Sequence, residues 1–143
     1  MQSAIGTAET AHELTMVSPA RRWTSWIITG LIVAFLLFDI VGKLMKPAAV
    51  VEGFARSGWP IALSVPIGII LLVCTILYLI PQTAILGAIL LTGYLGGAVA
   101  TNFRLQSPIF SYTLVPVYFG VLVWLALWLR DRRLQALVPL RSR

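Results

Sequence analysis

Four long apolar blocks, separated by short polar segments, organise the chain. The blocks cover residues 23–45, 60–80, 82–101 and 109–129. A helix needs about 20 predominantly apolar residues to cross the hydrocarbon core of a bilayer, so each block predicts one membrane-spanning helix. Backbone N–H and C=O groups find no water in that core, and a helix satisfies them within its own segment. The pattern therefore predicts an all-α integral membrane protein folded as a four-helix bundle.

The polar ends divide the chain into three expected regions. These are a polar N-terminal tail over residues 1–22, a four-helix transmembrane domain over 23–129, and a basic C-terminal tail over 130–143. A cleaved signal peptide is the competing interpretation of the first block. The long polar segment before that block, and the lack of an A-x-A motif after it, favour a retained helix.

The connections between the blocks predict how neighbouring helices are arranged. Pro81-Gln82-Thr83 is long enough only for a tight turn, so the second and third helices should be antiparallel neighbours. The first connection, residues 47–60, places Glu52 and Arg56 four residues apart beside an apolar side. This pattern favours a short helix that lies at the membrane surface.

Composition and charge agree with a membrane protein. The chain is 59% hydrophobic and 11% charged, outside the usual range of soluble domains. Its net charge of +6 comes from arginines and lysines beside the apolar blocks, and no soluble basic face for nucleic acid is visible. Basic residues are more numerous on the side of the two termini: Arg21, Arg22, Arg130, Arg132, Arg133, Arg141 and Arg143, against Lys43, Lys46, Arg56 and Arg104. The bias predicts both termini in the cytoplasm.

A small polar cluster is the candidate binding site. Asp39 and Lys43 lie one helical turn apart near the end of the first block, and Asn102 and Arg104 follow the third block. All four should lie toward the same side of the membrane. In a site, Asp39 would balance a cation or proton, Lys43 and Arg104 would bind an anionic group, and Asn102 would hydrogen-bond an uncharged one. The alternative is a local ion pair with side chains that extend to the interface.

Small residues in the third block predict close helix packing. Gly93, Gly97 and Thr101 recur four residues apart, and Gly96 and Ala100 form a parallel row beside them. Such rows let backbones approach closely in a membrane, although the polar end of this row could also line a site.

The scarcity of chemical groups narrows the functional classes. Cys74 is the one cysteine and His12 the one histidine, which excludes an intramolecular disulfide, a CxxC pair, a bis-histidine haem and a histidine-rich metal site. The sequence contains no paired carboxylates at useful spacing and no nucleophile with a neighbouring base. We therefore expect no catalytic activity from the chain alone and no evident cofactor. A quinone and a redox-enzyme partner protein stay open.

Several stretches of the chain resemble a known family. The most specific stretch is Pro81-Gln82-Thr83-Ala84 followed by Leu86 to Thr101, and the others are Phe38-Asp39…Lys43-Leu44, Gly58-Trp59-Pro60, Trp124…Leu129-Arg130-Asp131…Leu134 and Pro139-Leu140. Together they resemble the DoxX-like family of small four-span bacterial membrane proteins. In one departure, Asn102 stands where many such sequences carry a histidine, so a proton-carrying or ligating histidine is missing at this position.

The resemblance implies a place in the bacterial cytoplasmic (inner) membrane and a link to redox chemistry. The family name derives from a subunit associated with thiosulfate:quinone oxidoreduction, and relatives are linked to membrane complexes of thiol and oxidative-stress defence. It implies a non-catalytic membrane subunit of a quinone-linked or thiol/oxidative-stress redox assembly, with the lipid bilayer and a redox enzyme as partners. A homo-oligomer stays open. The alternative is a small transporter or lipid-binding protein with a polar cavity between the helices, and a third option is a scaffold.

Overall fold

The computed structural model describes residues 19–137, and every regular element in that range is a helix. The long helices are α2 (Pro19–Met45), α4 (Ser64–Leu79), α5 (Ala84–Arg104) and α6 (Val115–Arg130). The short ones are α3 (Ala48–Ser57), η1 (Ile61–Leu63), η2 (Ile109–Thr113) and α7 (Arg132–Leu137). Residues 1–18, with most of the predicted tail and His12, and residues 138–143, with Arg141 and Arg143, lie outside the described range.

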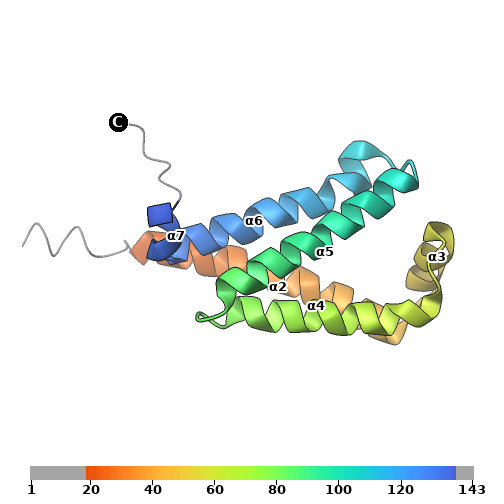
Figure 1. Cartoon of the computed structure of the whole chain (residues 1–143), viewed down its shortest axis with the longest axis horizontal. Coiled ribbons are helices and arrows are strands. Elements are labelled where there is room, and N and C mark those ends of the chain that lie inside the picture. Colours follow the sequence, from red (N-terminus) through yellow and green to blue (C-terminus); the bar gives the residue numbers. More distant parts are fainter. Residues whose placement is uncertain (1–18, 138–143) are drawn as a thin grey trace, which may run out of the picture.

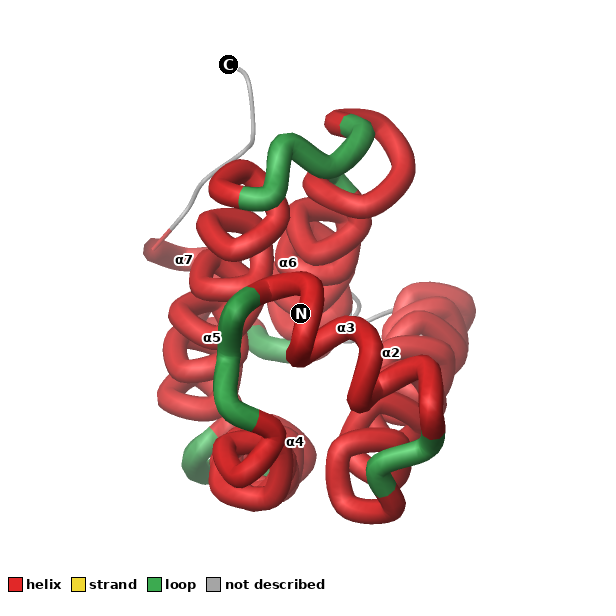
Figure 2. The backbone as a smooth tube through the Cα atoms, turned by 90° about the vertical axis from the view of Figure 1, so that its right-hand side faces the viewer, coloured by secondary structure: helices red, strands yellow, loops and turns green. Residues whose placement is uncertain are grey.

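Four segments of the described chain are long and apolar enough to cross a membrane: Pro19–Met45, Ile61–Leu79, Ala84–Arg104 and Ile109–Arg130. This confirms the predicted all-α, four-span fold. Both α2 and α5 contact α4 and α6, so the order around the bundle is α2, α4, α5, α6. The start of α2 lies beside the end of α6, and α3 lies at the opposite end (Figure 1). We call these the termini end and the α3 end; Figure 2 looks along the bundle from the α3 end.

Helix ends in left-handed conformation turn the chain sharply at the α3 end. Lys46 (φ 51°), Gly58 (φ 71°) and Gln106 (φ 50°) follow α2, α3 and α5. After α3, the Gly58 and Trp59 N–H groups donate to the Ala55 and Phe54 carbonyls, at 3.2 and 3.0 Å. This pairing satisfies the last carbonyls of a helix and stops it abruptly. These sharp turns therefore keep α3 close to the bundle helices before and after it in the chain, α2 and α4.

Prolines divide the second and fourth apolar blocks. Pro66 lies in the first turn of α4, after the 3-10 turn η1, instead of kinking a continuous helix. Pro116 lies in the first turn of α6, after the π-helical η2. A proline is tolerated in a first turn because an N–H there has no partner within the helix. Each block therefore spans as two helical pieces.

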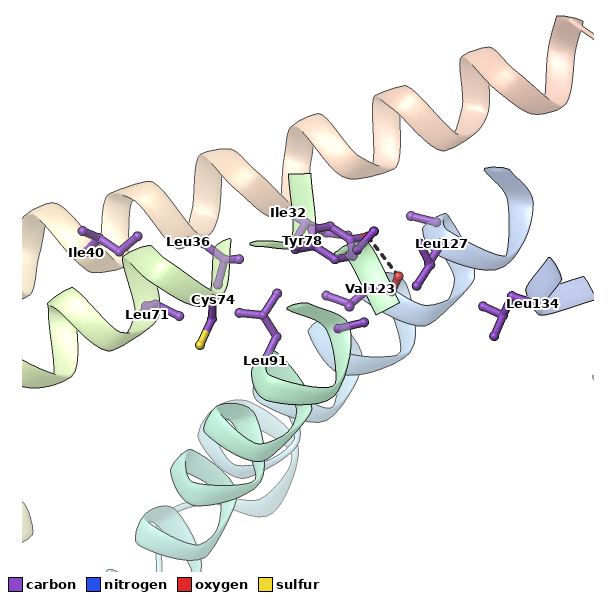
Figure 3. Packing of buried hydrophobic residues seen from close by; sticks show 13 residues of the cluster. Ile32, Leu36, Ile40, Leu71, Cys74, Tyr78, Leu91, Val123, Leu127 and Leu134 are labelled. Carbon is purple, nitrogen blue, oxygen red and sulfur yellow. Dashed lines mark hydrogen bonds between the residues drawn. The ribbon is translucent and has the colours of Figure 1, made fainter. Parts of the chain in front are cut away.

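The core lies between the four long helices. Buried side chains recur every three or four residues on each helix, as one inward-facing stripe requires. Figure 3 shows these residues, among them Ile32, Leu36 and Ile40 of α2, Leu71, Cys74 and Tyr78 of α4, Leu91 of α5, and Val123 and Leu127 of α6. The Tyr78 hydroxyl donates to the Val123 carbonyl at 3.0 Å, so α4 and α6 are joined across the bundle. Cys74 is buried here, as expected for a thiol that packs like a small hydrophobe.

Arg130, one of the arginines that the charge pattern uses to predict membrane orientation, also links two helices at the termini end. Arg130 at the end of α6 donates to the Tyr78 carbonyl at 2.9 Å, and its guanidinium lies 5.1 Å from the centre of the Tyr78 ring. The next residues, Ile80 to Thr83, leave the helix, so this carbonyl lacks a full set of helical partners. Arg130 therefore closes the end of α4 as well as ending α6.

Among the described glycines, the tightest contact with another helix lies outside the predicted ridge, at Gly87. A Cβ added to Gly87 of α5 would lie 2.3 Å from the Tyr78 nitrogen of α4. By contrast, a Cβ at Gly93, Gly96 or Gly97 would meet no atom within 4 Å. The three glycines thus lie away from the other described helices, and α5 diverges from α4 beyond the hairpin (Figure 1). Close helix packing through this ridge stays a prediction.

Candidate functional site

A cavity of about 870 Å³ lies at the α3 end, where the helices diverge. Its wall combines side chains from α2, α3, α4, α5 and η2 and from the segments that join them. The polar members are Lys43, Arg56, Ser57, Tyr94, Thr101, Asn102, Ser107 and Tyr112. The other members are Ala49, Val50, Gly53, Phe54, Trp59, Ile67, Gly93, Gly97, Ala98, Leu105 and Pro108. The cavity is thus mostly apolar with a few polar groups, as small-molecule sites usually are.

One face of α3 forms a side of the cavity. Val50, Phe54 and Ser57, which follow each other at helical spacing, line it, and Val51 and Glu52 are exposed and do not belong to the lining. No residue of α3 is buried. A helix with one apolar face that buries little protein surface is typical of the membrane interface. The predicted short helix is therefore present, its place at the membrane surface stays a prediction, and one of its faces lines the cavity.

Asp39, Lys43 and Tyr94 form a connected group at the inner end of the cavity. Lys43 makes an ion pair with Asp39 on the same helix, and the Tyr94 hydroxyl of α5 donates to the other oxygen of Asp39 at 3.0 Å. The Lys43 ammonium also lies 5.8 Å from the centre of the Tyr94 ring. This group links α2 to α5, the helix diagonally opposite in the bundle. The Asp39 carboxylate balances the charge of Lys43, and the hydrogen bond from Tyr94 fixes the orientation of that carboxylate.

Asn102 joins α5 to the start of the last span. Its amide nitrogen donates to the Ala98 carbonyl at 3.1 Å and to the Tyr112 carbonyl at 3.3 Å. In a regular helix the Tyr112 carbonyl would accept from the residue four positions on, which is Pro116 and has no N–H. Asn102 therefore supplies the missing donor. Because both amide hydrogens are used, its carbonyl oxygen is the polar atom that stays available to the cavity.

The structure brings together part of the predicted site. Lys43 and Asn102 both line the cavity, and Asp39 stands behind Lys43 as its counter-ion. Arg104 is exposed and does not belong to the lining, so it lies outside the cavity. Thr101, the last residue of the predicted packing row, lines the cavity together with Gly97 and Gly93. Gly96 and Ala100, in the parallel row, do not line it.

Arg56, Tyr94 and Tyr112 are lining residues that were not among the predicted site residues. Arg56 had been assigned to a pair with Glu52, yet the described chain records no ion pair for it. Tyr94 and Tyr112 look like ordinary members of apolar blocks, although a hydroxyl inside a span needs a partner and is itself a signal. Tyr94 finds that partner in Asp39.

The charged side chains in the lining of the cavity are basic. Lys43 and Arg56 are its charged lining residues, and the lining contains no aspartate or glutamate. Among residues 19–137 no group of three or more His, Cys, Asp and Glu side chains is placed to hold a metal ion. The arrangement can bind a headgroup rich in acceptor oxygens and hold the attached apolar chain. It offers no nucleophile paired with a base.

Comparison with known proteins agrees with the architecture. The model of the DoxX-like family matches residues 27–126, which run from α2 into α6 and include the whole α3 end. No curated protein and no solved structure matches the chain. With its four membrane-spanning helices, this chain is a multi-pass membrane protein that belongs to the DoxX-like family.

Proposed function

We propose that this protein is a non-catalytic membrane subunit of a quinone-linked or thiol/oxidative-stress redox assembly, and that its cavity holds the headgroup of a membrane amphiphile. The observation that carries the proposal is the cavity itself, which joins hydrogen-bonding groups to apolar walls at the α3 end. Polar groups fix a headgroup, and apolar walls accept the adjoining chain. The redox setting comes from the family resemblance, and the redox chemistry belongs to the partner protein.

The lining residues fit a quinone headgroup. Quinone carbonyl oxygens accept hydrogen bonds, which Lys43 and Arg56 can donate, and a quinol hydroxyl can donate to the Asn102 carbonyl oxygen. Phe54 and Trp59 offer flat aromatic surface to a ring. A bound quinone would supply the electron-transfer chemistry, while these residues would hold and orient it.

A lipid-binding protein or small transporter is the second candidate. The observation that favours it is the one-sided charge of the cavity, with two cations and no acid in the lining. An interfacial helix over a partly open cavity also suits a ligand that arrives from the bilayer surface.

Mass spectrometry of the protein purified gently from native membranes tests both candidates. Bound small molecules and copurifying proteins are recorded together. We expect a stoichiometric amphiphile and a redox-enzyme partner. A matched pair of variants assigns the amphiphile to the cavity: Gly97→Leu adds bulk to its wall, while Gly96→Leu adds the same side chain outside the lining. At both positions the added Cβ meets no atom within 4 Å, so the two changes start from equally open positions.

The outcomes separate the parts of the proposal. Loss of the amphiphile in Gly97→Leu and its retention in Gly96→Leu support the cavity as the binding site. Equal retention in both variants shows that the headgroup is bound elsewhere. An amphiphile without any redox partner removes the subunit role and favours the lipid-binding candidate.

A further inference from the structure

The charged groups that face the cavity come from two elements. The α2 helix contributes Lys43 and α3 contributes Arg56, while the lining residues of α4, α5 and η2 are all uncharged. Cations that face a shared space without acids create a local positive potential, and low-dielectric walls strengthen it. We therefore expect a ligand whose charge complements this potential.

The two cations are not equivalent. Lys43 is already paired with Asp39, whose second oxygen accepts from Tyr94, so this group contributes little net charge. Arg56 is exposed on the last turn of α3, and the described residues give it no ion pair, although Glu52 lies one turn before it. Arg56 is thus the lining cation without an ion pair in the described part of the chain, and the fork of its guanidinium matches phosphate oxygens.

We propose that the cavity selects an anionic phospholipid, with Arg56 as the residue that recognises its phosphate. This inference rests on the proposed function, that the cavity holds the headgroup of an amphiphile. A headgroup of net charge −1, such as phosphatidylglycerol, neutralises Arg56. A zwitterionic phosphatidylcholine brings an ammonium group that finds no carboxylate in the lining. A neutral quinone brings no negative charge to neutralise Arg56.

The surroundings of Arg56 suit a lipid that stays in the bilayer. Val50, Phe54 and Leu105 provide apolar surface beside the polar groups, and Trp59 follows α3 at a position where aromatic residues meet headgroups. Because α3 has the character of an interfacial helix, Arg56 lies at headgroup level. The phosphate can bind there while the acyl chains remain in the hydrocarbon core.

Native mass spectrometry of the full-length, delipidated protein in detergent tests the inference. Phosphatidylglycerol, phosphatidylcholine and ubiquinone are each added at matched concentrations, and inorganic phosphate is added as a soluble competitor. We expect phosphatidylglycerol to bind best, and Arg56→Gln to weaken its binding about tenfold, the usual scale for losing a charged hydrogen-bond partner. Arg56→Lys should keep most of the preference, since the charge is retained.

Arg104→Gln is the matched control. Arg104 is an exposed arginine at the same end of the bundle, but it does not line the cavity, so its loss should leave phosphatidylglycerol binding unchanged. Equal loss in Arg56→Gln and Arg104→Gln would reveal general surface attraction and overturn the inference.

The remaining outcomes distinguish this inference from the proposed function. Equal binding of phosphatidylglycerol and phosphatidylcholine, or preferred binding of ubiquinone, overturns anionic selection but leaves a headgroup cavity. Displacement by inorganic phosphate identifies a free anion as the occupant and overturns the lipid assignment. Binding that Gly97→Leu does not change for any amphiphile contradicts the proposed function itself.

Discussion

At the scale of single residues, two glycines of α5 have opposite roles. Gly87 allows the α5 backbone to approach α4, where a Cβ would lie 2.3 Å from the Tyr78 nitrogen and 2.5 Å from its Cα. These are backbone atoms, so they cannot move aside as a flexible side chain would. Gly93, less than two turns further along, faces open space and lines the cavity. The contact at Gly87 holds the hairpin, and the space at Gly93 belongs to the cavity.

Gly87→Ala should therefore destabilise the protein. Forcing the two backbones apart costs about 1–3 kcal/mol, the usual range for overpacking. The free energy of unfolding in mixed micelles, followed by far-UV circular dichroism during SDS titration, measures the effect. Gly93→Ala is the control, and it should leave stability unchanged or raise it by up to about 1 kcal/mol, because alanine favours a helix over glycine. Equal stability of the two variants would show that α4 and α5 do not meet at Gly87.

At the scale of elements, the junction between α5 and the last span depends on a missing donor. Pro116 lies in the first turn of α6, and the preceding segment η2 has π-helical hydrogen bonding. The Tyr112 carbonyl then accepts from Asn102 of α5 instead of from the backbone. The proline that interrupts the helix thus creates the link that positions η2 beside the cavity. Asn102 holds this wall of the cavity, besides presenting its own oxygen.

Asn102→Ala should cost about 1 kcal/mol of stability, the typical net value of one hydrogen bond. Pro116→Ala restores an N–H four residues after Tyr112, so the backbone can satisfy this carbonyl. The same Asn102→Ala change should then cost less than half as much in the Pro116→Ala background. A double-mutant cycle on unfolding free energies measures this coupling. Strict additivity of the two changes would disprove the link between the proline and the asparagine.

At the scale of the whole molecule, the two ends of the bundle differ in chemistry. The termini end is fastened by Arg130 on Tyr78 and by Arg21, which lies 5.6 Å from the centre of the Trp128 ring. The α3 end opens into the cavity. The excess of arginine at the termini end predicts that this end faces the cytoplasm and that the cavity faces the other side.

Cysteine labelling in intact cells measures this orientation. Glu52→Cys on α3 and Arg133→Cys on α7 are both exposed and lie at opposite ends. In cells whose outer membrane is permeabilised and whose inner membrane is intact, a membrane-impermeant maleimide should label Glu52→Cys. The same reagent should label Arg133→Cys only after the cells are lysed. Wild-type protein is the blank, because Cys74 is buried in the core. The reverse labelling pattern would place the termini outside the cytoplasm.

Several features of this protein follow from its sequence. The four spans do, because lipid leaves a long apolar segment little choice but a helix that bonds to itself. The short turn between the second and third blocks makes α4 and α5 antiparallel neighbours, and Asp39 and Lys43 pair because one helical turn separates them. The α5 helix continues to Arg104, three residues beyond the predicted end of the third span at residue 101, since polar residues can continue a helix beyond the hydrocarbon core.

Only the tertiary structure decided which residues meet. In a bilayer both the interior and the lipid face are apolar, so hydropathy does not set how each helix is rotated about its axis. For this reason the sequence did not show that Tyr94 meets Asp39, that Asn102 meets Tyr112, or that Gly87 and not Gly93 is the close contact. The cavity arises from the same cause. It exists because α5 diverges from α4 and α3 lies across the gap, and both depend on contacts between segments distant in the sequence.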